Sequence, residues 1–304
     1  MIESSIIKSE SGVMNKIKDY LQLVKLSLSI MVVFSSVICY LLAPKVVEFD
    51  WWMILLLFAG GMLVTGSANA INQVVEKDTD ALMRRTAKRP VAAGRMTVQE
   101  GWAFAILAGA MGVFILGNYF NWLAAGLAAF SLFLYAFIYT PLKKVNSIAV
   151  LMGAIPGALP CLIGWAAGDD KLSTGGWVLF GLQFFWQFPH FWAIAWIAHE
   201  DYTRVGFKLL PADKGPTKFT ALQTVIYSLL LLPVTLIPYF IGMCEYNSVA
   251  GMIGLGLIVL ANGFMIIRSV NLYQKMDVQS ARKVMFGSYM YLPVVLLALL
   301  MSKI

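Results

Sequence analysis

Long apolar runs separated by short polar connections dominate this chain of 304 residues. A run of about 20 apolar residues is long enough to cross a hydrocarbon core of about 30 Å as a helix, and lipid-facing backbone must be helical because its polar groups need internal partners. The pattern predicts nine such spans, at residues 21–43, 51–75, 101–118, 120–140, 147–168, 175–198, 219–242, 247–268 and 285–302. We therefore expect an all-α, polytopic membrane protein, with a tail at 1–20 and a single nine-helix transmembrane domain at 21–304.

Composition supports this interpretation, since 60% of the residues are hydrophobic and 13% are charged, which is far too apolar for an ordinary soluble domain. Lysine and arginine fall in alternate connections; the sixth connection, for example, contributes Arg204, Lys208, Lys214 and Lys218. Only Lys45, Lys171 and Lys303 fall on the opposite side. The positive-inside rule then predicts a cytoplasmic N-terminus and a C-terminus outside. This bias explains the net charge of +7, so no nucleic-acid partner is expected.

The first apolar run is too long for a typical cleavable signal, and further spans follow it. The tail before it lacks arginine and contains Glu3, Glu10 and Asp19, unlike a mitochondrial transit peptide. These features favour the plasma membrane, meaning the inner membrane of a bacterium. The three cysteines are isolated, without metal-ligand spacing, and we interpret them as packing residues: Cys39, Cys161 and Cys244.

The first polar cluster comprises Asn72, Glu76 and Asp80, at the end of the second predicted span. On a helix each four-residue step turns only about 40° beyond a full circle, so these side chains share one face. An amide and two carboxylates, with Asp78 close by, are oxygen ligands that suit Mg²⁺. The cluster therefore predicts a Mg²⁺ site.

Basic residues follow this cluster directly, namely Arg84, Arg85, Lys88 and Arg89. Such groups bind phosphate oxygens through charge-assisted hydrogen bonds. Acids that hold a metal, beside bases that hold phosphate, would stabilise a diphosphate leaving group as its charge develops. The alternative is that these acids and bases pair with one another at a cytoplasmic helix end. That alternative is weaker for Asn72 and Glu76, because polar groups in or near an apolar span are costly.

The segment NQVVEKDTDALMRRTAKRP, residues 72–90, resembles the signature N-x-x-x-(D/E)-x-x-x-D-x-x-M-x-R-T-x-x-R-P of the UbiA-type superfamily of membrane prenyltransferases. The resemblance implies a nine-helix bundle with a central cavity open to the cytoplasm and the membrane. It also implies Mg²⁺ and an isoprenyl diphosphate bound by motifs after the second and sixth helices. It assigns catalysis to Asn72, Glu76, Asp80, Arg85 and Arg89. Arg84 and Lys88 fall at unspecified positions of the signature, and we expect them to bind substrate because of their charge.

The segment after the sixth span lacks the second acidic motif, D-x-x-x-D, that most members of that superfamily carry. It reads WQFPHFWAIAWIAHEDYTRVGFKLLP from Trp186 to Pro211, which resembles the pattern W-Q-x-P-H-F…D-Y…G…L-P of the branch that farnesylates protohaem. The segment Tyr139–Lys144, with Gly153, Gly157, Pro160 and Gly164–Trp165 after it, resembles the same branch. The resemblance covers about two-thirds of the chain, and the last three spans are generic.

His190 follows Pro189 inside the sixth predicted span. A buried histidine in an apolar helix is usually a hydrogen-bonded packing residue, but imidazole is also an axial ligand of haem iron. Proline frees a backbone carbonyl one turn back, and Gln187 lies one turn away. Together with the resemblance, this favours a haem-facing His190, as an iron ligand or as a polar contact to the porphyrin. The resemblance adds Asp201 and Tyr202 as substrate-binding residues.

Lys143 and Lys144 follow Tyr139 at the cytoplasmic end of the fourth predicted span. These lysines either anchor the helix at the lipid headgroups or, as the resemblance implies, contact the diphosphate. Both interpretations stay open, and Tyr139, Lys143 and Lys144 are all candidates for substrate binding.

The sequence as a whole favours an enzyme that transfers the farnesyl group of farnesyl diphosphate to a vinyl group of haem b, with water, giving haem O and diphosphate. The alternative acceptors are a quinone precursor or a chlorin; the missing D-x-x-x-D and the Pro189-His190-Phe191 motif argue against them. A membrane transporter would place charge near the bilayer midplane, whereas here charge gathers at one face. Expected partners are membrane lipid and, by resemblance, haem A synthase or terminal-oxidase assembly proteins.

Overall fold

The computed structural model describes residues 2–211 and 215–304, with side chains from residue 12 onward. Lys214, which the topology prediction counted in the sixth connection, lies outside the described residues. The described chain is all-helical, as predicted. Its elements are α1 (Ile2–Leu23), α2 (Leu26–Leu42), α3 (Trp51–Val75), α4 (Lys77–Leu82), α5 (Val98–Tyr119), α6 (Trp122–Phe133), a π-helical turn η1 (Leu134–Tyr139), α7 (Thr140–Leu142), α8 (Ile148–Asp169), α9 (Thr174–Ile197), α10 (His199–Arg204), α11 (Lys218–Phe240), α12 (Val249–Lys275) and α13 (Val278–Met301).

Seven helices of the described chain are long and apolar enough to cross a membrane, and the pair Gly12–Leu23 and Leu26–Leu42, bent by 48°, raises the number to eight. The chain is therefore a multi-pass membrane protein. α9, which the sequence predicts as the sixth span, is a continuous helix of 24 residues but is not among these spans. Its glutamines, tryptophans and His190 lower its mean hydropathy, because this helix faces the bundle interior and carries polar groups there.

Short polar residues start several of these helices. The side chain of Asp50 accepts hydrogen bonds from the backbone of Trp52 and Met53 at the start of α3. Thr97 caps α5 and Asp277 caps α13 in the same way, each through a backbone amide three residues on. Such caps satisfy amides that have no partner within the helix, so the sequence itself sets where these helices begin.

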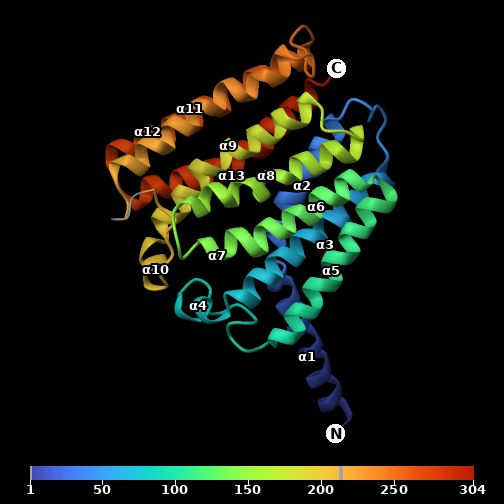
Figure 1. Ribbon diagram of the computed structural model, residues 1–304, viewed down its shortest axis with the longest axis vertical. Coiled ribbons are helices and arrows are strands. Elements are labelled where there is room, and N and C mark those ends of the chain that lie inside the picture. The colour runs from blue at the N-terminus through green and yellow to red at the C-terminus, as the bar shows by residue number, and fades with distance from the viewer. Residues whose placement is uncertain (1, 212–214) are drawn as a thin grey trace.

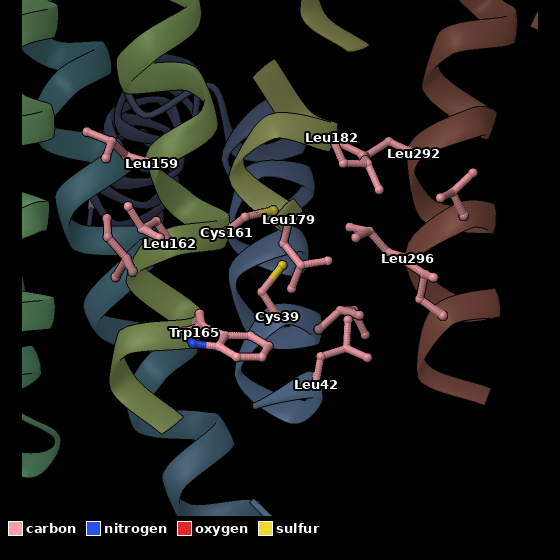
Figure 2. Packing of buried hydrophobic residues seen from close by; sticks show 14 of the residues in the cluster. Cys39, Leu42, Leu159, Cys161, Leu162, Trp165, Leu179, Leu182, Leu292 and Leu296 are labelled. Atoms are coloured by element: carbon pink, nitrogen blue, oxygen red, sulfur yellow. The ribbon is translucent and has the colours of Figure 1, made fainter. Parts of the chain in front are cut away.

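The centre of the bundle is packed by α2, α8, α9 and α13 (Figure 2), whose side chains include Cys39, Leu162, Leu179 and Leu296. A side chain at Gly164 would collide with the backbone carbonyl of Ser36, so α2 and α8 are in close backbone contact there. Small residues allow such approach between membrane helices. All three cysteines are buried and free of disulfide bonds, in agreement with packing roles.

The two short helices α4 and α10 lie at one end of the bundle, and the C-terminus lies at the other (Figure 1). α4 follows a break at Glu76 and α10 follows a break at Ala198, where the backbone of both residues leaves helical geometry. The chain therefore leaves the bundle at corresponding points after α3 and α9. These two exits bring the two polar segments of the sequence to the same end of the molecule.

Candidate active site

A cavity of about 260 Å³ lies at the end of the bundle that carries α4 and α10. Its walls come from segments far apart in the sequence: α2, α3, the loop after α4, η1, α8, α9, α10 and α13. Both polar segments singled out in the sequence contribute to it. The predicted site residues that line this cavity are Asn72, Glu76, Arg85, Arg89, Tyr139, Lys143, His190 and Tyr202.

Asn72, Glu76 and Lys143 form a buried hydrogen-bonded group on one wall of the cavity. The Asn72 Nδ2 donates to Glu76 Oε2 at 2.7 Å, as expected for residues four apart on a helix. The Lys143 Nζ donates to Glu76 Oε1 at 2.8 Å and to Asn72 Oδ1 at 2.9 Å. The lysine ammonium thus neutralises a carboxylate that would otherwise be buried without a counter-charge, which is costly.

Asp80 lies in α4, beyond the break at Glu76, and its side chain is fully buried. The Arg89 Nη1 donates to Asp80 Oδ2 at 2.6 Å, whereas Asp80 Oδ1 is buried without a hydrogen-bond partner. Burial raises the pKa of the Asp80 carboxyl above its ordinary value, and the Arg89 guanidinium acts in the opposite direction. A buried carboxylate oxygen without a partner can accept a cation.

The three predicted metal ligands do not lie on one uninterrupted helix face, because the break at Glu76 separates α3 from α4. Within the described residues, no three histidine, cysteine or acidic side chains are grouped as a metal site. The donor set here is two carboxylates and one amide. Because Mg²⁺ commonly takes only one or two carboxylates and completes its shell with water and substrate phosphate, this set is chemically suited to it.

The π-helical turn η1 decides which lysine reaches the cavity. Pro141 has no backbone N–H, and just before it the Thr140 N–H and hydroxyl both bond the Tyr135 carbonyl. Lys143 then points inward, with its Nζ 4.5 Å from the centre of the Tyr139 ring. Lys144 is exposed and does not line the cavity.

His190 lines the same cavity, on α9. Its Nδ1 is 2.8 Å from Ser288 Oγ on α13, and its ring stacks on Trp186 with the centroids 4.9 Å apart. Nε2 has no hydrogen-bond partner among the described residues. A histidine held through one ring nitrogen, with the other free beside a cavity, is the arrangement that ligation or substrate contact requires.

Arg85 and Tyr202 join the two polar segments. The Arg85 Nη2 lies 3.3 Å from the Tyr202 hydroxyl, and the guanidinium lies 5.9 Å from the centre of that ring. Both residues line the cavity. The loop after α4 and the helix α10 therefore meet at one site.

Five predicted site residues lie outside the cavity lining. One of them, Asp80, is fully buried behind it and reaches the site through its ion pair with Arg89, which lines the cavity. Arg84, Lys88 and Lys144 are exposed, and Asp201 is partly exposed on α10. Four other residues take part although the sequence did not single them out for the site: Lys25, Tyr135, Ser288 and Tyr289. The available signals were weak, namely a lone lysine at the start of an apolar run and a polar Ser-Tyr pair within the last one.

A second, largely apolar cavity of about 130 Å³ adjoins the first and shares Leu28 and Tyr135 with it. It lies between α2, α3, α6 and α8 and extends toward the other end of the bundle as far as Leu116 and Ile163. The polar cavity therefore continues into an apolar space of the kind that accepts a hydrocarbon chain.

Comparison with known sequences gives consistent matches. The sequence pattern of the UbiA prenyltransferase family matches residues 32–293. The protoheme IX farnesyltransferase of Cytophaga hutchinsonii is 43% identical over 286 residues, covering 94% of this chain and 97% of that protein. The protein of the same name from Flavobacterium johnsoniae is 38% identical over 288 residues, with 94% of each chain covered.

Solved structures share the fold at lower sequence identity. A structure of digeranylgeranylglyceryl phosphate synthase superposes with a TM-score of 0.75 at 20% identity, covering 95% of this chain and 98% of that one. A UbiA homolog from Archaeoglobus fulgidus bound to GPP and Mg²⁺ superposes with a TM-score of 0.66 at 14% identity, covering 92% of this chain and 99% of that one.

Proposed function

The chain belongs to the UbiA prenyltransferase family, and we propose that it transfers the farnesyl group of farnesyl diphosphate to a vinyl group of haem b. The observation that carries this proposal is a single cavity lined by both polar segments, with an apolar extension beside it. One segment has the chemistry of a diphosphate site, and the other presents His190. The names of the relatives at 38–43% identity support the choice of haem as acceptor.

The donor half of the site is made by Asn72, Glu76 and Asp80. Their oxygens would hold Mg²⁺, and the buried, unpartnered Asp80 Oδ1 supports this assignment. When bound, the ion would withdraw electron density from the diphosphate and so favour loss of this group. Lys143 must then move away from Glu76, because in this structure its ammonium donates a hydrogen bond to the Glu76 carboxylate.

Basic side chains around the cavity bind and neutralise the diphosphate. Arg85 and Arg89 enter from the loop after α4, Lys143 from the end of α7, and Lys25 from the start of α2. Each can donate charge-assisted hydrogen bonds to phosphate oxygens as the bond to the farnesyl carbon breaks. The apolar cavity next to Tyr135 accommodates the farnesyl chain and keeps water from it.

The reaction breaks the C1–O bond of farnesyl diphosphate and forms a bond between C1 and the terminal vinyl carbon. The diphosphate leaves with the electron pair of the broken bond. Water adds to the resulting benzylic-type cation and releases a proton, which leaves a hydroxyl group on haem O. No side-chain nucleophile is needed, and the residues act by binding, orientation and charge neutralisation.

We further propose the topology that the lysine and arginine bias predicts, with nine spans, a cytoplasmic N-terminus and the C-terminus outside. α9 is then the sixth span, and residues 21–304 act as one domain. The site lies at the cytoplasmic end, where soluble farnesyl diphosphate can enter, and the membrane is the bacterial plasma membrane. Haem A synthase or terminal-oxidase assembly proteins would receive the product.

The test is an assay with purified protein, haem b, farnesyl diphosphate and Mg²⁺, analysed by mass spectrometry. We expect the hydroxyethylfarnesyl adduct of haem, and we expect its loss when a chelator removes the divalent metal. Product from a quinone precursor but not from haem would instead assign the chain to the alternative acceptor.

The acceptor half is tested by His190→Ala. If Nε2 contacts the iron or the porphyrin, this variant changes the absorbance spectrum of bound haem and weakens haem binding. Ser288→Ala is the matched control, because it removes the hydrogen bond to Nδ1 and leaves the imidazole in place. An unchanged haem spectrum and affinity in His190→Ala would make His190 a packing residue.

A further inference from the structure

A third cavity, of about 270 Å³, lies directly beside the candidate active site. It is formed by the end of α9, by α10 and by the loop that follows. Four residues line both this cavity and the active site, namely Ala195, Tyr202, Phe207 and Leu209. The two spaces are therefore neighbours with a shared border, at the end of the bundle that carries α4 and α10.

This border is held in place by backbone contacts. Gly206 has a φ of +76°, a conformation that favours glycine, and the Phe207 amide bonds the Tyr202 carbonyl at 2.9 Å. Phe207 is buried against Tyr202, with the ring centroids 5.8 Å apart. The Lys208 amide bonds the Lys143 carbonyl at 2.8 Å, which fixes this loop to the helix end that supplies the diphosphate site.

The lining of this cavity offers hydrogen-bond donors and positive charge. It contains Lys208, His199, Thr203 and Tyr202, and none of the described residues that line it is a carboxylate. Lys208 is exposed, and its ammonium has no ion-pair partner among the described residues. Glu200 and Asp201 lie on α10 but are not part of the lining. An exposed lysine beside hydroxyl and imidazole groups in such a space suits a carboxylate ligand.

We propose that this third cavity binds the propionate carboxylates of the porphyrin acceptor, with Lys208 as the principal charged contact. The inference rests on the proposed function. In protohaem the two vinyl groups and the two propionates lie on opposite sides of the macrocycle. When a vinyl group faces the diphosphate site beside Lys143, the propionates point away from it. A macrocycle resting on Tyr202 and Phe207 then reaches the third cavity, and propionate binding selects which edge of the porphyrin meets the farnesyl carbon.

The test uses haem b and its dimethyl ester, which differ only in the two carboxylates. Dissociation constants are measured by absorbance titration of the full-length protein in detergent. Lys208→Gln is expected to weaken haem b binding about tenfold and to leave binding of the dimethyl ester unchanged. The matched control is Lys218→Gln, an exposed lysine outside the cavity lining. Because Lys208 is exposed, its replacement leaves the core intact, and a melting curve checks this.

The subsite would be overturned if Lys208→Gln weakened the binding of haem b and of its dimethyl ester equally, or weakened the binding of neither. Equal affinity of the wild-type protein for haem b and its dimethyl ester would also overturn it. The farnesyl-transfer assay on the wild-type protein separates this failure from that of the proposed function. Product formed from haem b, together with equal affinities, rejects only the subsite; absence of any haem product rejects the function on which it rests.

Discussion

Glu76→Gln is expected to lower the rate of farnesyl transfer by about 10³-fold while haem binding stays unchanged. The substitution keeps the size of the side chain but removes a negative charge that a divalent metal needs. Glu76 is buried at the end of α3 and hydrogen-bonds Asn72 and Lys143, whereas His190 lies on α9 and contacts Ser288 and Trp186. The measurement pairs single-turnover product formation with a haem titration of the same preparation.

Asp78→Asn is the matched control for this prediction, because Asp78 is an exposed acid only two residues away and does not line the cavity. It should leave the rate within about twofold of the wild-type value. Of the two variants, only Glu76→Gln should show both a lower rate of farnesyl transfer and a loss of its dependence on Mg²⁺. Full activity in Glu76→Gln would show that the metal assignment is wrong.

Arg89→Ala is expected to lower both stability and activity, with a loss of about 3 kcal/mol in the free energy of unfolding. The Asp80 carboxylate is fully buried, and Arg89 is its only ion-pair partner in the described chain. Removing the guanidinium leaves a buried charge without compensation. Melting curves in detergent measure the effect, and exposed Arg84→Ala is the control, with a shift expected within about 0.5 kcal/mol.

The double variant Asp80→Asn/Arg89→Ala separates stability from catalysis. Because it removes the buried charge together with its partner, it should recover most of the lost stability. It should stay inactive, since both a metal ligand and a diphosphate contact are gone. If the single and double variants melt at the same temperature, the ion pair is not what holds α4 against the following loop.

Local features of the sequence explain much of this protein. The prediction of residues 51–75 as a span matches α3 (Trp51–Val75), because Asp50 caps the helix at one end and the apolar run stops near Glu76 at the other. The contact between Asn72 and Glu76 follows from their four-residue spacing. The ion pair between Asp80 and Arg89 agrees with the alternative interpretation of this cluster, in which its acids and bases pair with one another.

Other features depended on contacts that periodicity does not encode. Lys143 and Lys144 are equivalent in the sequence, and the π-helical turn before Pro141 determines that Lys143 faces Glu76. Ser288 meets His190 from a helix 98 positions later in the chain, within a span that the sequence presents as generic. The third cavity results from a glycine turn at Gly206 and from the packing of Phe207 against Tyr202.

The sequence by itself determined that this is an all-helical membrane protein with an acidic and basic cluster at one end of a helix. It could do so because lipid forces each apolar span to satisfy its own hydrogen bonds, and helical spacing is a local property. Only the tertiary structure decided that this cluster, His190 and Tyr289 line one cavity. Their proximity depends on how α2 packs against α3 and α8, and how α9 packs against α8 and α13. This packing is set by side chains distant in the chain.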